Sequence, residues 1–201
     1  TVSRHVVAAS RDYFAYASVT SVQIFRRSDF RLVKLLTPPG SGLQGITGLC
    51  WNPLDETKLA TCHASGEIFI FDIETEQVDA EHKGASLASS VLCISWSGVW
   101  PDQSLIGFVL KDDRTVGFVN TRTGDVTSLF SMGAGGFTGK PTPIVRFHPT
   151  VHGLLLCGAP DGSYIVYDMT NRRKTVVEAK VKDNKVEDVQ WDPLSQSYFI
   201  I

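Results

Sequence analysis

The sequence lacks long apolar runs, helical periodicity and a large net charge of either sign. Apolar stretches such as Leu105 to Leu110 fall far short of the ~20 residues that a membrane-spanning helix needs. The net charge of −2 gives no electrostatic reason to expect nucleic acid as a partner. No capped segment with apolar residues three and four apart extends beyond one turn. We therefore expect neither a helical domain, nor nucleic-acid binding, nor membrane insertion.

Cysteines are few, and none has the spacing of a metal site. The four are Cys50, Cys62, Cys93 and Cys157, and each lies in an apolar run. This placement favours buried free thiols in a reducing compartment over a disulfide framework. Because there is also no signal-peptide pattern, we expect a cytoplasmic protein, with the cilium or the cytoskeleton as narrower alternatives.

A short motif that begins with an aromatic residue recurs at intervals of about 45 residues, which is the repeat length of a propeller blade. Each copy ends an apolar stretch. The four copies are Trp51-Asn52-Pro53-Leu54, Trp96-Ser97-Gly98, Phe147-His148-Pro149 and Trp191-Asp192-Pro193-Leu194. We call Trp51, Trp96, Phe147 and Trp191 the anchors. They are expected to fill the space between neighbouring sheets, so that Trp96→Ala costs about 3–5 kcal/mol.

Three further apolar runs follow each of the first three anchors, separated by polar turns. They are short and rich in Val, Ile, Phe and Tyr, which is typical of strands. The predicted fold class is all-β: propeller blades of four antiparallel strands, with about four and a half blades present. The first blade shows only three recognisable strands, at 14–18, 22–26 and 32–36. Residues 1–201 are interpreted as a single propeller segment, with blades at approximately 5–37, 46–81, 91–130 and 144–181 and a partial blade at 186–201.

Acidic and amide side chains recur at the turns of this repeat. Asp72, Asn120 and Asp168 end the third strand of their blades and can accept backbone N–H groups in the turn that follows. Asp113 and Asp161 lie in the turns between the second and third strands. We interpret all five, like the anchors, as structural residues.

On these residues the chain resembles the WD-repeat family. The anchors match, as do the turn pairs Asp161-Gly162, Asp113-Arg114 and Ser65-Gly66. The family's Trp-Asp dipeptide is degraded to Phe71-Asp72, Val119-Asn120 and Tyr167-Asp168. The resemblance implies a larger, seven-bladed propeller whose remaining blades come from the same longer chain.

The sequence departs from the family in two ways. No third strand carries the tryptophan, and no Gly-His pair precedes the first strands. The family's buried histidine–aspartate–serine–tryptophan network is therefore not expected, and packing must join the blades. The stretch 186–195 carries the closest resemblance to one particular member.

Candidate catalytic and ligand-binding motifs fail in detail. The segment 134–141 resembles a phosphate-binding loop, but Ala134 replaces its first glycine and Pro141 replaces its hydroxyl residue. Cys62 and His63 are neighbours on a strand, so their side chains point to opposite faces. His148 and His152 lie four apart in what we interpret as a solvated turn rather than a zinc site. The short basic runs Arg26-Arg27 and Arg172-Arg173-Lys174 are typical of a solvated edge, with phosphate or acidic-peptide contact as the alternative.

The remaining candidates for function are the loops between blades, at 37–45, 84–90 and 131–143. Loops on a rigid scaffold commonly carry function, and we predict contacts to other proteins through Leu43, Gln44, Phe137 and Lys140. No cofactor, metal or catalytic residue is predicted. The favoured function is a non-catalytic scaffold for protein–protein interaction within a multiprotein assembly. The alternatives are a structural subunit of a ciliary, cytoskeletal or coat-like complex and a propeller enzyme with a site at the channel mouth.

Overall fold

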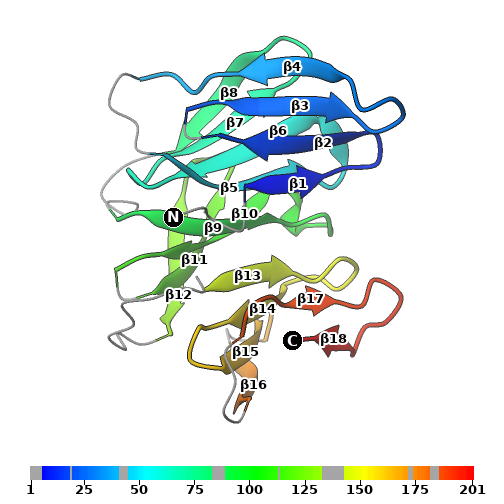
Figure 1. Ribbon diagram of the computed structural model, residues 1–201. Helices are drawn as coiled ribbons and strands as arrows, with labels where there is room; N and C mark the ends of the chain where they lie inside the picture. The colour runs from blue at the N-terminus through cyan, green and yellow to red at the C-terminus, as the bar shows by residue number, and fades with distance from the viewer. Residues whose placement is uncertain are drawn as a thin grey trace. The chain divides into compact units, whose positions relative to one another are not determined.

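Short antiparallel strands build the chain in the computed structural model, which describes residues 6–18, 20–40, 45–82, 89–112, 114–132, 143–171, 174–181 and 186–201. Figure 1 labels the strands in chain order. In these ranges the only helical element is a three-residue 3-10 turn, η2 (Asp102–Ser104). No helix in the same ranges is long and apolar enough to cross a membrane.

Four sheets hold four strands each, a fifth holds two, and in every sheet the strands lie side by side in chain order. The first blade comprises β1 (Val7–Ala9), β2 (Tyr13–Ala17), β3 (Val22–Arg26) and β4 (Leu32–Leu36). The second comprises β5 (Ile46–Asn52), β6 (Asp55–His63), β7 (Ile68–Asp72) and β8 (Gln77–His82). The third comprises β9 (Val91–Trp96), β10 (Leu105–Leu110), β11 (Thr115–Asn120) and β12 (Val126–Ser131). The fourth comprises β13 (Ile144–Phe147), β14 (Leu154–Gly158), β15 (Ser163–Asp168) and β16 (Lys174–Lys180), and the half blade comprises β17 (Gln190–Trp191) and β18 (Phe199–Ile200).

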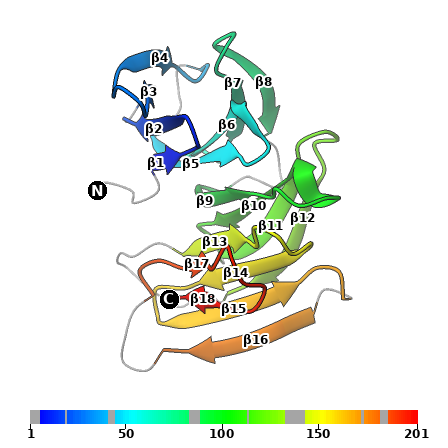
Figure 2. The ribbon, with the colours of Figure 1, turned by 90° about the vertical axis from the view of Figure 1, so that its right-hand side faces the viewer.

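The predicted all-β fold with four antiparallel strands per blade is confirmed, as is the half blade at the end. Strand β1 is the one strand that the sequence does not predict, because three residues are too few to show an alternating pattern. The outer position of the fourth strand is also confirmed. Every residue of β10 is buried, whereas β8 alternates and ends its sheet as an edge strand. Figure 2 shows the same order in the fourth blade, from β13 to the outer strand β16.

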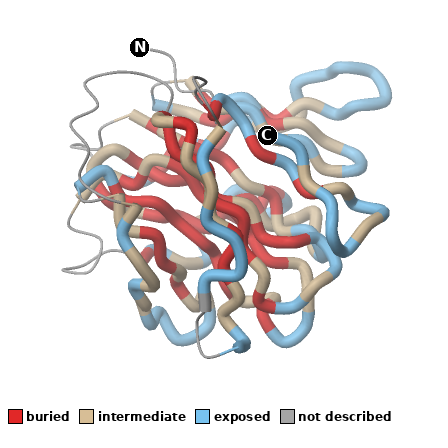
Figure 3. The backbone as a smooth tube through the Cα atoms, turned by 90° about the horizontal axis from the view of Figure 1, so that it is seen from below, coloured by how far each residue is buried: buried red, intermediate tan, exposed pale blue. Residues whose placement is uncertain are grey.

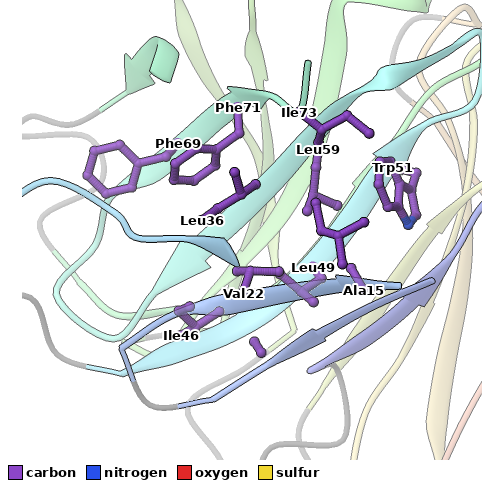
Figure 4. Packing of buried hydrophobic residues seen from close by; sticks show 12 residues of the cluster. Ala15, Val22, Leu36, Ile46, Leu49, Trp51, Leu59, Phe69, Phe71 and Ile73 are labelled. Atoms are coloured by element: carbon purple, nitrogen blue, oxygen red, sulfur yellow. The ribbon is translucent and has the colours of Figure 1, made fainter. Parts of the chain in front are cut away.

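The chain divides into two compact units, residues 1–94 and 95–201, and each is described by itself. In both units the buried residues lie mainly in the inner strands, whereas the turns and the outer strands are largely exposed or half-buried (Figure 3). The core of the first unit lies between the first and second blades. Figure 4 shows Ala15 and Val22 of the first blade facing Leu49, Leu59 and Trp51 of the second.

One apolar core of the second unit joins the fourth blade to the half blade. It includes Ile144 and Leu156 of the fourth blade and Val186, Val189 and Trp191 of the segment that follows. Gly158 allows this close approach, because a Cβ atom there would lie 2.7 Å from a methyl carbon of Val186. Only glycine leaves room for the incoming segment.

Candidate interaction surfaces

The four anchors are all buried within their blades. Trp51 is 5% exposed, Trp96 6%, and Phe147 and Trp191 8% each. Each stands at the end of the first strand of its blade, or one residue before it in β5. Their rings therefore add buried apolar area at the start of each blade.

Two anchors also bond to the blade that precedes them. The indole Nε1 of Trp51 donates a hydrogen bond of 3.2 Å to the carbonyl of Ala8 in β1. The indole Nε1 of Trp191 donates a bond of the same length to the carbonyl of Arg146 in β13. Arg146 is the residue before the anchor Phe147. Ala8 occupies the equivalent position in the first blade. Two residues after it, the backbone N–H of Ser10 donates across the turn to the carbonyl of Tyr13, and two residues after Arg146 the backbone N–H of His148 donates across its turn to the carbonyl of Leu154. The contact is thus a repeated feature of the fold.

The third and fourth blades are joined by different groups at the same place. Phenylalanine has no N–H on its ring, and here the backbone N–H of Phe147 donates to Oγ of Ser95 at 3.0 Å. Ser95 is the residue before the anchor Trp96. A second bond of 2.9 Å runs from the backbone N–H of Gly153 to the buried carboxylate of Asp102. The indole of Trp96 instead donates to the carbonyl of Gln103 in its own blade, at 2.9 Å.

These bonds correct the expectation that packing alone joins the blades. A further contact links the second blade to β9, where Oγ1 of Thr47 donates to the carbonyl of Val91 at 2.5 Å. Each bond contributes roughly 0.5–1.5 kcal/mol net, and losing a buried partner costs more. Within each unit, neighbouring blades are therefore joined by polar contacts in addition to their apolar cores.

The acidic and amide turn residues accept backbone N–H groups after their strands. Asp72 accepts from Glu74 at 2.8 Å, Asn120 from Arg122 at 2.9 Å and Asp168 from Thr170 at 2.7 Å. Asp161 accepts from the backbone of Ser163 at 3.1 Å and also binds its hydroxyl. Lys58 donates to Asp72 at 2.7 Å, and chiefly this bond lowers the pKa of that carboxyl to about 2.

Several sequence-predicted residues lie outside the described ranges. They are Asp113, the candidate contacts Leu43, Gln44, Phe137 and Lys140, and most of the 131–143 loop with its segment 134–141. Their proposed contacts with other proteins stay predictions.

The first blade has an apolar face that the sequence analysis did not single out. Ladder partners share a face of a sheet, so Val7, Tyr16, Gln23 and Leu35 form one row across its four strands. A second row on that face runs through Ala9, Phe14, Phe25 and Leu32. We call this surface the anchor face, because Ala9 occupies the anchor position. The signal was present in the sequence, since β2, β3 and β4 carry apolar residues at successive positions rather than alternate ones.

In the second blade the corresponding row is Trp51, Leu59 and Phe71, and it is buried against the first blade. In the first blade the anchor face is largely open. Leu32 and Leu35 are each 54% exposed and Phe30 is 74% exposed. Phe30 lies against Phe14, which stacks on Phe25 with ring centroids 5.0 Å apart. The first blade thus exposes an apolar face, whereas the corresponding face of the second blade is buried.

His148 is buried, so the prediction of a solvated turn for this residue was wrong. Its Nδ1 accepts the backbone N–H groups of Thr150 and Val151, at 3.0 and 2.9 Å, and its ring packs on Trp191 with centroids 4.5 Å apart. Burial lowers the pKa of His148. His152 is partly exposed and pairs with Asp102 at 3.2 Å. Asp102 is thus a nearby carboxylate that sequence spacing did not reveal.

The four cysteines are free, and Cys62, Cys93 and Cys157 are buried. Burial raises the pKa of the Cys62 thiol, which disfavours the thiolate that a nucleophile needs. The neighbouring His63 is also buried, and its Nε2 forms a hydrogen bond of 3.0 Å with the hydroxyl of Thr61. Within the described ranges, no cluster of three or more metal-ligating side chains occurs.

Comparison with known proteins agrees with this architecture. Residues 8–99, a little under half of the chain, match a family described as the anaphase-promoting complex subunit 4 WD40 domain. A chain in a solved structure described as "Crystal Structure of Mitotic Checkpoint Complex" superposes with a TM-score of 0.76. The fold is that of a β-propeller. The superposition covers 97% of this chain at 14% sequence identity, so it shows the fold alone. This chain spans about half of the matched chain, 55% of its length.

Proposed function

We propose that this chain is a non-catalytic scaffold for protein–protein interaction, and that its blades are one segment of a larger propeller. The open anchor face of the first blade is the observation that carries the proposal of a larger propeller. In the same unit, the corresponding face of the second blade is buried against a sheet lined by Ala15, Val22 and Ile24. An apolar face of this kind calls for a similar sheet to cover it. We propose further blades of the same longer chain as that cover.

The similar proteins support a role inside an assembly. The matching family is described as the WD40 domain of anaphase-promoting complex subunit 4, and the matched chain comes from a solved structure described as the mitotic checkpoint complex. Both descriptions are of multiprotein complexes. For the present chain we therefore propose a place in a multiprotein assembly, with a structural subunit of a ciliary, cytoskeletal or coat-like complex as the narrower alternative.

A closer relationship and a compartment are also proposed. The stretch Val186–Ser195, together with the divergent first blade, resembles the amino-terminal propeller of WD-repeat-containing protein seventeen. Four free cysteines, three of them buried, suit a reducing compartment such as the cytoplasm. Affinity purification of the full-length protein followed by mass spectrometry tests the assembly and its compartment together.

The open face is tested by sedimentation of the 201-residue chain alone. We expect self-association, because the anchor face is uncovered, and we expect Leu35→Lys to suppress it. Leu54→Lys is the matched control, since Leu54 is similarly exposed, at 59%, but lies in a turn away from that face. A monomeric wild-type chain, or equal effects of the two substitutions on self-association, would refute the proposal that further blades cover the anchor face.

A further inference from the structure

A hollow in the first blade is lined almost wholly by hydrogen-bond donors. Its volume is about 540 Å³, and its lining residues are Arg11, Asp12, Tyr13, Arg26, Arg27 and Ser28. They come from the turn between β1 and β2, from the start of β2 and from the end of β3 with its following turn. We infer that this hollow binds an oxyanion carried by a peptide, either an acidic side chain or a phosphate group. The inference rests on the proposed docking function and gives that function a site.

Arg27 is held in position by the protein itself. Its Nη1 donates to the carbonyls of Ser10 at 2.8 Å and Arg11 at 3.1 Å, and its backbone N–H donates to the carbonyl of Asp12 at 2.9 Å. The side chain therefore ties the two turns together. A guanidinium has five N–H donors, and two bonds from one nitrogen leave the others for a ligand. Among the described residues Arg27 has no carboxylate partner, so its charge is not neutralised by a direct pair.

The other two arginines have carboxylate partners, but the pairs are weak. Arg11 contacts Asp12 at 3.3 Å and Glu56 at 3.5 Å, with 82% of its side chain exposed. Arg26 contacts Asp29 at 3.3 Å, with 49% of its side chain exposed. Exposed pairs of this kind add little stability because water and salt screen them. A ligand that accepts two bonds from each guanidinium can therefore displace them.

Tyr13 and Ser28 also line the hollow. The side chains of Tyr13 and Ser28 have no hydrogen-bond partner within the described ranges. Asp12 is the single acidic residue of the lining, beside three arginines. Glu56 and Asp29, which lie outside the lining, contact Arg11 and Arg26, so Arg27 is the arginine whose charge no direct pair offsets among the described residues. Carboxylate and phosphate are the groups that match a set of forked, charged donors.

Fluorescence anisotropy with labelled decapeptides tests the site. The probes are a glutamate–glycine peptide, the same peptide with two phosphoserines, and a neutral version with glutamine in place of glutamate. We expect the acidic peptides to bind, the neutral peptide to bind at least tenfold more weakly, and added salt to weaken the acidic complexes. A phosphopeptide preference of tenfold or more, with competition by inorganic phosphate, assigns the ligand as phosphate. Equal binding of the two acidic peptides assigns it as carboxylate.

The variant Arg11→Gln/Arg26→Gln keeps Arg27, which ties the turns, and should weaken acidic-peptide binding by tenfold or more. Arg122→Gln is the matched control, because Arg122 is exposed in a turn of the third blade, far along the chain from the hollow. Thermal unfolding of each variant shows whether the fold is intact, and Arg11→Lys/Arg26→Lys, which keeps the charge, should restore part of the affinity. The inference is overturned if the acidic peptides do not bind or if the neutral peptide binds equally well. It is also overturned if Arg11→Gln/Arg26→Gln and the control Arg122→Gln have the same affinity for the acidic peptides.

Partner capture with the same variants separates this inference from the proposed function. If Arg11→Gln/Arg26→Gln retains the partners of the wild-type protein and peptide binding is absent, the site is wrong and the docking function stands. If acidic peptides bind through the arginines and the protein captures no partner, the site stands and the docking function fails.

Discussion

Replacing Trp51 by phenylalanine separates the hydrogen bond between two blades from the packing that surrounds it. Trp51 is 5% exposed, and its indole donates to the carbonyl of Ala8 at 3.2 Å. Its ring also stacks on Tyr13, with centroids 6.1 Å apart and the ring planes 26° apart. Phenylalanine keeps an aromatic ring in this space but cannot donate to Ala8.

The expected loss has two parts. A net hydrogen bond contributes roughly 0.5–1.5 kcal/mol, and the smaller ring gives up part of its contact with the core. We therefore expect Trp51→Phe to lower the free energy of unfolding by about 1–3 kcal/mol. Trp51→Ala should cost about 3–5 kcal/mol, because it also leaves a cavity between the first two blades.

Urea denaturation followed by circular dichroism measures these losses. Trp100→Phe is the control, because Trp100 is 75% exposed and its replacement should change stability by less than about 0.5 kcal/mol. If Trp51→Phe and Trp100→Phe had the same denaturation midpoint, the indole bond would contribute nothing and the polar joint would be refuted.

Three further predictions concern single groups, each measured by the midpoint of unfolding. Asp102→Ala leaves the backbone N–H of Gly153 without its acceptor and should cost about 1–3 kcal/mol, whereas Asp102→Asn, which keeps an acceptor, should cost less; equal losses would contradict this role. Gly117→Ala should cost about 1–3 kcal/mol, because its Cβ would lie 2.5 Å from the carbonyl oxygen of Thr127, and an unchanged midpoint would show that the strand yields. Burial holds the pKa of His148 below its ordinary value of 6.5, so the unfolded chain binds the proton first and stability is lost as the pH falls below 6.5. The His148→Gln variant should lose less stability than the wild type between pH 7.5 and pH 5.5. An equal loss would show that protonation of His148 is not the cause of the pH dependence.

The sequence was sufficient for every strand except β1 but not for the contacts between blades. Strands such as β9 and β11 follow from short runs of β-branched and aromatic residues between turns, and these signals are local. The acceptor of the Trp51 indole is a backbone carbonyl in another blade, and every residue type has one. Likewise, a polar turn such as His148-Pro149-Thr150 is typical of solvent exposure, and only the approach of Trp191, more than 40 residues later, buries the histidine.

The first blade differs from the others because its anchor position carries no aromatic ring. Ala9 has neither a ring nor a side-chain N–H, so the first blade cannot donate the indole bond that Trp51 and Trp191 donate. Its anchor face offers Phe14, Phe25 and Phe30 instead, an apolar surface without a directional donor. A sheet that covers this face is therefore held by apolar burial alone, unless that sheet itself supplies a hydrogen-bond donor. Without that bond the joint is weaker by about 0.5–1.5 kcal/mol than an otherwise equal joint with an indole. If further blades cover this face, as proposed, that joint should open before the joint between the first and second blades, which has the Trp51 bond, and hydrogen exchange in β1 to β4 should be faster than in β5 to β7.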